Sequence, residues 1–138
     1  VPFLRSRFNE RNGGISPDGH WMAYGSDESG RSEVYVQSFP TPGSKYQVST
    51  TGATFGWWSR DGKEMGLLAE DGSILLEDVR TTPTFTAGAP RAIIKLRPDV
   101  VATGATGDLQ RVLVSVPIGA AASPSLVLEL NWMSALKR

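Results

Sequence analysis

Residues 15–24 have the sequence ISPDGHWMAY, and the turn at its centre, Ser16-Pro17-Asp18-Gly19, decides the fold. Proline fixes φ at the second position of such a turn, and the aspartate side chain bonds to nearby backbone amides. Glycine then accepts the positive φ that completes the reversal of the chain. One Asp-Gly turn indicates only a hairpin between two antiparallel strands.

The same four-residue turn occurs a second time, which indicates an internal repeat rather than a single hairpin. Ser59-Arg60-Asp61-Gly62 follows 43 residues after the first copy, and the same spacing relates Met22 to Met65 and Gly13 to Gly56. A period of ~40–45 residues with about four strands in each unit is typical of a β-propeller blade. A third copy is expected over residues 102–108, where a glycine-rich stretch has lost the Ser-Pro-Asp-Gly form.

The apolar residues form short runs rich in β-branched and aromatic types, each closed by a turn that contains glycine or proline. The chain is therefore predicted to be all-β. The only helix-compatible stretch is residues 133–138, which is too short to be stable alone. The expected strands are 1–6, 12–16, 21–26, 33–39, 46–49, 55–59, 64–69, 74–79, 92–96, 100–103, 111–116 and 126–131.

These strands divide a single domain, residues 1–138, into three blades. Blade one is expected at 12–49, blade two at 55–96 and blade three at 100–131, with strand 1–6 supplying the fourth strand of a third blade. Closed propellers need roughly four to eight blades, so three cannot close a ring. We expect two copies to form a six-bladed ring, with strand 1–6 of each completing blade three of the other. The alternative is that the chain is part of a longer propeller.

Several segments together resemble a known family. Residues 15–24, the loop 26–30 and the strand 33–36 are similar to the TolB-type, WD-like propeller repeat. Residues 8–10, 39–40, 58–62 and 130–132 resemble C-terminal propellers of bacterial proteins associated with serine/threonine kinases. This resemblance implies a bacterial source and a binding or sensor module. The chain lacks the phosphate loop, His-Arg-Asp and Asp-Phe-Gly motifs of kinases. The compartment, cytoplasmic or periplasmic, stays open.

Composition excludes several classes of function. The 14 basic and 14 acidic residues balance, which gives no electrostatic reason to expect a nucleic-acid partner. The chain has no cysteine and one histidine, so thiolate chemistry is absent and histidine-built metal sites are disfavoured. No apolar stretch approaches the ~20 residues that cross a bilayer, and the opening residues show no signal-peptide pattern. No cofactor or metal is expected.

Three groups of residues invite a chemical reading. His20 follows a turn glycine and is expected to be exposed, without a nucleophile or an orienting carboxylate beside it. The acidic residues of 26–33 lack the spacing of a calcium loop, so a polar turn with local ion pairs is preferred. Trp57 and Trp58 must face opposite sides of their strand; Trp58 is assigned to the core, and Trp57 either packs or stacks on a ligand. Trp21 is expected to be partly exposed.

Binding residues of propellers concentrate on loops. The loops between successive blades and those between the second and third strands of each blade emerge at the same end of a propeller. A binding site is therefore expected there, with Trp57 as a stacking candidate. The leading hypothesis is a non-catalytic scaffold for a protein, peptide or small ligand. The alternatives are a propeller enzyme of hydrolase or lyase type, a sensor fragment of a kinase-linked protein, or a fragment that only self-assembles. The predicted ligand-binding residues are Asn9, Arg11, Asp27, Arg31 and Trp57.

Overall fold

A computed structural model describes residues 3–117 and 126–131 of the chain. This part contains twelve strands and no helix, and therefore no helix that could cross a membrane. The strands are β1 (Glu10–Ile15), β2 (Trp21–Ser26), β3 (Glu33–Ser38), β4 (Lys45–Gln47), β5 (Ala53–Trp58), β6 (Glu64–Ala69), β7 (Ser73–Arg80), β8 (Thr86–Ala87), β9 (Arg91–Lys95), β10 (Val101–Ala105), β11 (Arg111–Val116) and β12 (Leu126–Asn131).

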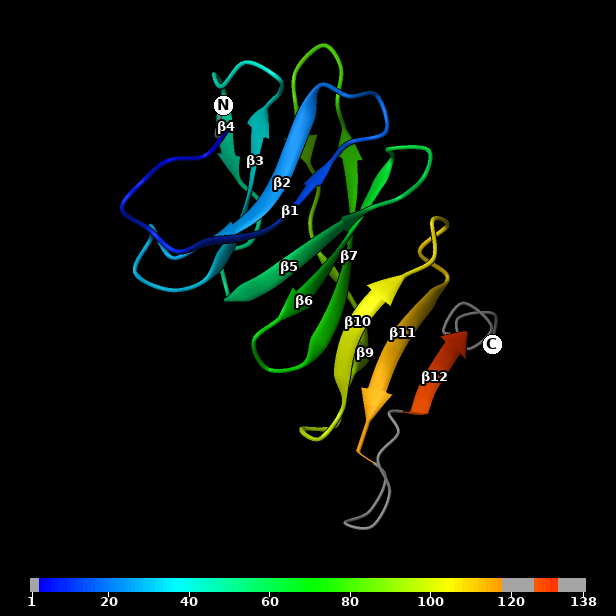
Figure 1. The fold of residues 1–138 in the computed structure, drawn as a ribbon. Coiled ribbons are helices and arrows are strands. Elements are labelled where there is room, and N and C mark those ends of the chain that lie inside the picture. Colours follow the sequence, from blue (N-terminus) through cyan, green and yellow to red (C-terminus); the bar gives the residue numbers. More distant parts are fainter. Residues whose placement is uncertain (1–2, 118–125, 132–138) are drawn as a thin grey trace.

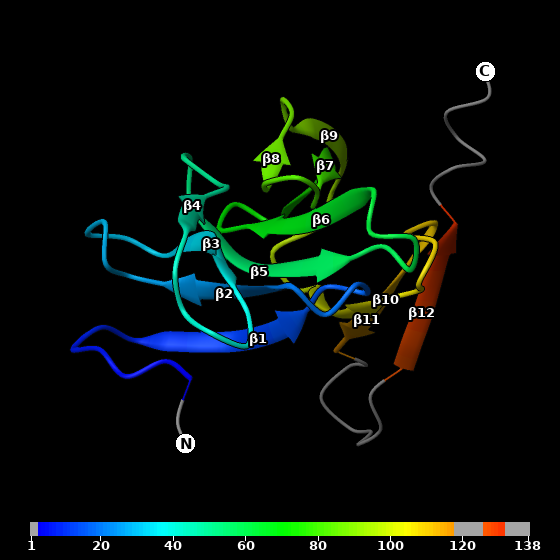
Figure 2. The same cartoon turned by 90° about the horizontal axis from the view of Figure 1, so that it is seen from above.

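The strands form three antiparallel sheets that follow one another in chain order (Figures 1 and 2). The first sheet, blade one, has the order β1-β2-β3-β4. Blade two contains β5-β6-β7, with β9 beside β7 and the short β8 pairing the end of β7. Blade three contains β10-β11-β12 in the described part of the chain. The all-β prediction and the division into three sheets are confirmed, whereas β8 was not foreseen.

One predicted strand is absent. Phe3–Asn9, the described part of the opening segment, forms no strand, and the Phe3 ring instead lies 5.1 Å from that of Phe39. The expectation of a strand over 1–6 is thus wrong for the single chain, and residues 1 and 2 lie outside the described part. The physical reason is that strand backbone needs a neighbouring strand to satisfy its amides and carbonyls.

The two Ser-x-Asp-Gly turns have the same internal hydrogen bonds. Ser16 Oγ donates to Asp18 Oδ1 at 2.6 Å, and Asp18 Oδ1 accepts the backbone N–H of His20 at 3.1 Å. In the second copy Ser59 Oγ donates to Asp61 Oδ1 at 2.7 Å, which accepts the N–H of Lys63 at 3.1 Å. Each serine oxygen also accepts the first amide of the following strand, so the turn fixes where that strand begins.

The expected third copy of the turn is present, and it keeps the hydrogen bonds of the other two although its sequence has lost the Ser-Pro-Asp-Gly form. It begins at Thr106, whose Oγ1 donates to Asp108 Oδ1 at 2.5 Å, and Asp108 accepts the N–H of Gln110 at 3.0 Å. Leu109 stands where glycine stood before and takes a positive φ of 54°. Its buried side chain offsets the cost of that backbone, because it packs into the apolar cluster between blades two and three.

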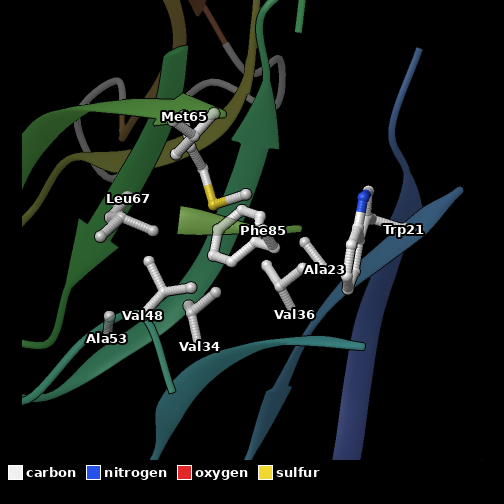
Figure 3. Packing of buried hydrophobic residues seen from close by; sticks show 10 residues of the cluster. Trp21, Ala23, Val34, Val36, Val48, Ala53, Met65, Leu67 and Phe85 are labelled. Atoms are coloured by element: carbon white, nitrogen blue, oxygen red, sulfur yellow. The ribbon is translucent and has the colours of Figure 1, made fainter. Parts of the chain in front are cut away.

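The first apolar cluster joins blades one and two (Figure 3). Phe85, from the segment that follows β7, lies at its centre and contacts the rings of Trp21 and Tyr46, with centroids 5.8 and 5.5 Å away. Trp21 is therefore buried rather than partly exposed, and its Nε1 donates to the Thr81 carbonyl at 2.9 Å. The buried members are Trp21, Ala23, Val34, Val36, Val48, Ala53, Met65, Leu67, Val79 and Phe85.

A second apolar cluster joins blades two and three. Ile74 and Leu76 of β7 pack with Leu109, Val112 and Val114. Because successive residues of a strand face opposite sides, β7 presents these two residues to blade three and Leu75 and Val79 to blade one. Blade two is thus the only described sheet with a neighbour on both of its faces.

Candidate functional site

The three blades follow one another in an arc, and their strands have two ends. At one end of the strands the segment before β1 and the β2–β3 connection lie side by side (Figure 1). The β4–β5 and β6–β7 connections belong to the same end, because consecutive antiparallel strands alternate in direction. We call it the loop end. The turns around Asp18, Asp61 and Asp108 lie at the other end, which we call the turn end.

Three of the predicted binding residues meet at the loop end. The backbone N–H of Asn9 donates to Asp27 Oδ1 at 3.0 Å, and Asn9 Nδ2 donates to Asp27 Oδ2 at 2.5 Å. The side-chain and backbone hydrogen bonds from Asn9 lower the pKa of Asp27, and the Arg11 guanidinium adds to the effect. Asp27 is therefore held as an anion beside a cation at the start of the innermost strand, β1.

Arg31, also predicted to bind a ligand, is engaged within the protein. Its Nε donates to Glu33 Oε1 at 2.6 Å, and an Nη atom donates to the Thr50 carbonyl. The buried Glu33 also accepts hydrogen bonds from Ser49 Oγ and, at 3.0 Å, from the N–H of Gly52. The Glu33 carboxylate therefore fastens the β2–β3 connection to the chain that enters blade two.

The two adjacent tryptophans face opposite blades, as predicted. Trp58 packs with blade one, and its Nε1 donates to the Gly14 carbonyl at 3.0 Å. Trp57 packs in the cluster facing blade three, 4.8 Å from the ring of Phe55 and against Gly66. The structure thus places Trp57 between blades and away from the group formed by Asn9, Arg11 and Asp27.

Other residues considered in the sequence have local partners. His20 is exposed in its turn, and its backbone N–H bonds to Asp18. The Glu28 carboxylate lies 2.7 Å from Lys45 Nζ, so the carboxylates of 26–33 have separate partners, as expected of a polar turn. Within residues 3–117 and 126–131 no three potential metal ligands gather into one site.

Sequence reasoning missed a buried carboxyl group in β7. Glu77 is 2% exposed, and its Oε2 atom has no hydrogen-bond partner among the described residues. It is paired across the sheet with Met65 and lies on the same side of β7 as Leu75 and Val79, facing blade one. Burial raises its pKa to about 7. The signal was present in the sequence: Glu77 occupies an apolar position of the strand alternation.

A polar cavity of about 680 Å³ opens at the turn end between blades two and three. Its walls are the β5–β6 and β10–β11 turns, joined by a hydrogen bond of 2.5 Å from the N–H of Arg60 to the Gly107 carbonyl. The carboxylates of Asp61 and Asp108 that line it already accept hydrogen bonds within their own turns. The lining residues are Ser59, Arg60, Asp61, Glu64, Thr106, Gly107, Asp108 and Gln110.

Comparison with solved structures finds the same fold in two longer chains. Oligogalacturonate lyase from Vibrio parahaemolyticus matches over 83% of this chain, with a TM-score of 0.60 and 16% identity. TolB from Acinetobacter baumannii matches over 94% of this chain, with a TM-score of 0.56 and 21% identity. The chain is a partial β-propeller. The match covers 32% of the oligogalacturonate lyase chain and 31% of the TolB chain. This chain therefore spans about a third of the length of each of those proteins.

The comparisons support the TolB-like part of the resemblance at the level of fold. At 16% and 21% identity the likeness carries no information about activity. No protein-family model matches the chain, and no curated protein matches it. The association with kinases implied by the resemblance stays a prediction.

Proposed function

We propose that this propeller is a non-catalytic interaction module that binds a protein, peptide or small ligand at its loop end. The observation that carries the proposal is the group formed by Asn9, Arg11 and Asp27. Arg11 is exposed and makes no ion pair among the described residues, whereas the nearby Asp27 is occupied by Asn9. An arginine fork held beside a fixed carboxylate suits the carboxylate or carbonyl groups of a peptide.

The module is proposed to work as a ring of two copies. Blades one and two each have a fourth strand, β4 and β9, whereas the described part of blade three has three strands. Phe3–Ser6 aligns with Tyr46–Ser49, 43 residues later, which contains part of the fourth strand of blade one. Phe3 also contacts the ring of Phe39, which follows β3, much as Tyr46 contacts the ring of Phe85, which follows β7. These likenesses support a role for Phe3–Ser6 as the missing strand of a second copy.

A random peptide library displayed on phage tests the binding function. The expected result is enrichment of peptides that bind the purified protein, and calorimetry should show about tenfold weaker binding to Arg11→Ala. Arg97→Ala is the matched control, because Arg97 is an exposed arginine that pairs with Asp99. Peptides that bind all three proteins equally, or no enrichment at all, would overturn the proposal.

A further inference from the structure

The joint between blades one and two shows how this propeller holds one blade against the next. Trp58, at the end of β5, donates a hydrogen bond from Nε1 to the Gly14 carbonyl of β1. Its Cδ1 atom lies 3.9 Å from the position that a Cβ on Gly14 would take. A side chain at the end of each innermost strand can thus insert against the innermost strand of the preceding blade.

Strand pairing identifies the equivalent positions in the other blades. Trp58 pairs with Met65, Ile15 pairs with Met22, and Ala105 pairs with Val112. Ile15 is therefore the counterpart of Trp58 in blade one, where no described blade precedes it. Its side chain is accordingly 51% exposed, one of the large apolar residues left on the described surface.

Blade three has a position equivalent to the one at Gly14 that receives Trp58, and no other described residue occupies it. Gly104 pairs with Leu113 as Gly14 pairs with Ala23, yet Leu113 is 41% exposed while Ala23 is 1% exposed. Among residues 3–117 and 126–131, no atom lies within 4 Å of a Cβ built on Gly104. A cavity of about 190 Å³ lies at this place, lined by Gly104, Ala105, Thr106, Arg111 and Leu113. These residues correspond to Gly14, Ile15, Ser16, Trp21 and Ala23 of blade one.

We propose that Ile15 of one copy inserts into this cavity on blade three of a second copy. The inference rests on the proposed two-copy ring and names the contact that closes it. The occupant is a second copy because the protruding residue and its receiving cavity lie on the two end blades of the same chain. Two such joints, related by a twofold axis, cover Leu113 and the neighbouring Val101, which is 58% exposed. Covering these side chains removes apolar surface from water at both joints.

Cysteine cross-linking between copies tests the joint, since the chain contains no cysteine of its own. Ile15→Cys and Gly104→Cys proteins are prepared separately, mixed, and treated with a short bismaleimide. The expected product is a covalent dimer in the mixture and none in either protein alone, because the two Ile15 positions lie at different joints of the ring. Equal dimer in the single-variant samples, or none in the mixture, would overturn the joint.

Sedimentation of the uncross-linked proteins separates this joint from the proposals on which it rests. The wild-type chain is expected to be a dimer at micromolar concentration. Ile15→Val should remain a dimer, and Ile15→Asp should become a monomer with an unchanged circular dichroism spectrum. A dimeric Ile15→Asp protein refutes the joint and leaves the ring standing, whereas a monomeric wild-type chain refutes both. Peptide binding through Arg11 is measured independently, so its failure would leave the joint intact.

Discussion

At the scale of the residue, Glu77 makes stability depend on pH. Burial raises the pKa of its carboxyl from an ordinary value of 4.5 to about 7. The folded protein therefore binds more protons than the unfolded chain between these values, and stability falls as the pH rises through that range. Above pH 7 the loss is complete and amounts to about 3 kcal/mol. Glu77→Gln removes the ionisable group, so its stability at pH 8 should approach that at pH 5.

Urea unfolding at pH 5 and pH 8 measures this difference. Glu77→Asp, which keeps a carboxyl group in the same apolar setting, is the control and should remain less stable at pH 8. A glutamine variant that loses as much stability as the wild type between the two pH values would contradict the assignment.

The turns show what single residues allowed us to predict. Ser16-Pro17-Asp18-Gly19 and its second copy were recognisable because each residue type has a distinct conformational role. Thr106 and Leu109 perform two of those roles in the third copy, yet threonine replaces serine and leucine is rarely found at positive φ. Leu109 is tolerated because blade two buries it, and that contact could not be read from the local sequence.

At the scale of the element, Glu33 holds two connections together and should matter far more than its partner Arg31. Glu33 is buried, so Glu33→Ala leaves Ser49 Oγ and the Gly52 amide without their acceptor and should cost about 3 kcal/mol. The Arg31 side chain is 50% exposed, so in Arg31→Ala water can replace the guanidinium while Glu33 keeps its hydrogen bonds from Ser49 and Gly52, and the change should cost only about 1 kcal/mol. Urea unfolding of both variants measures the difference. Equal losses would mean that the ion pair, rather than the buried hydrogen bonds, stabilises this end.

The periodicity of apolar residues predicted the strands accurately. β2, β6 and β11 begin and end at the predicted residues, because apolar alternation and turn residues agree there. The contacts within the candidate site were harder to predict from the sequence. Loop topology placed Asn9 and Asp27 at one end of the strands, where they are hydrogen-bonded to each other. It could not show that Arg31 is bound to Glu33, since that depends on the path of the chain between β4 and β5.

At the scale of the whole molecule, the proposed ring makes thermal stability a function of concentration. Association of folded chains favours the folded state by mass action, so the Tm of the wild-type protein should rise by several degrees between micromolar and hundred-micromolar samples. Leu113→Asp places a charge in the proposed joint and should abolish this rise. Differential scanning calorimetry over the concentration series provides the measurement. A Tm independent of concentration in the wild type would contradict ring formation.

The position of blade two between two apolar clusters has a consequence for dynamics. Val79 contributes to the cluster shared with blade one, and Ile74 and Leu76 contribute to the cluster shared with blade three. Opening either outer sheet disrupts one cluster, whereas unfolding the middle sheet disrupts both. Local unfolding should therefore begin in the outer blades, one and three, and spread to blade two. The amide hydrogens of β6 and β7 should be the last to exchange with solvent.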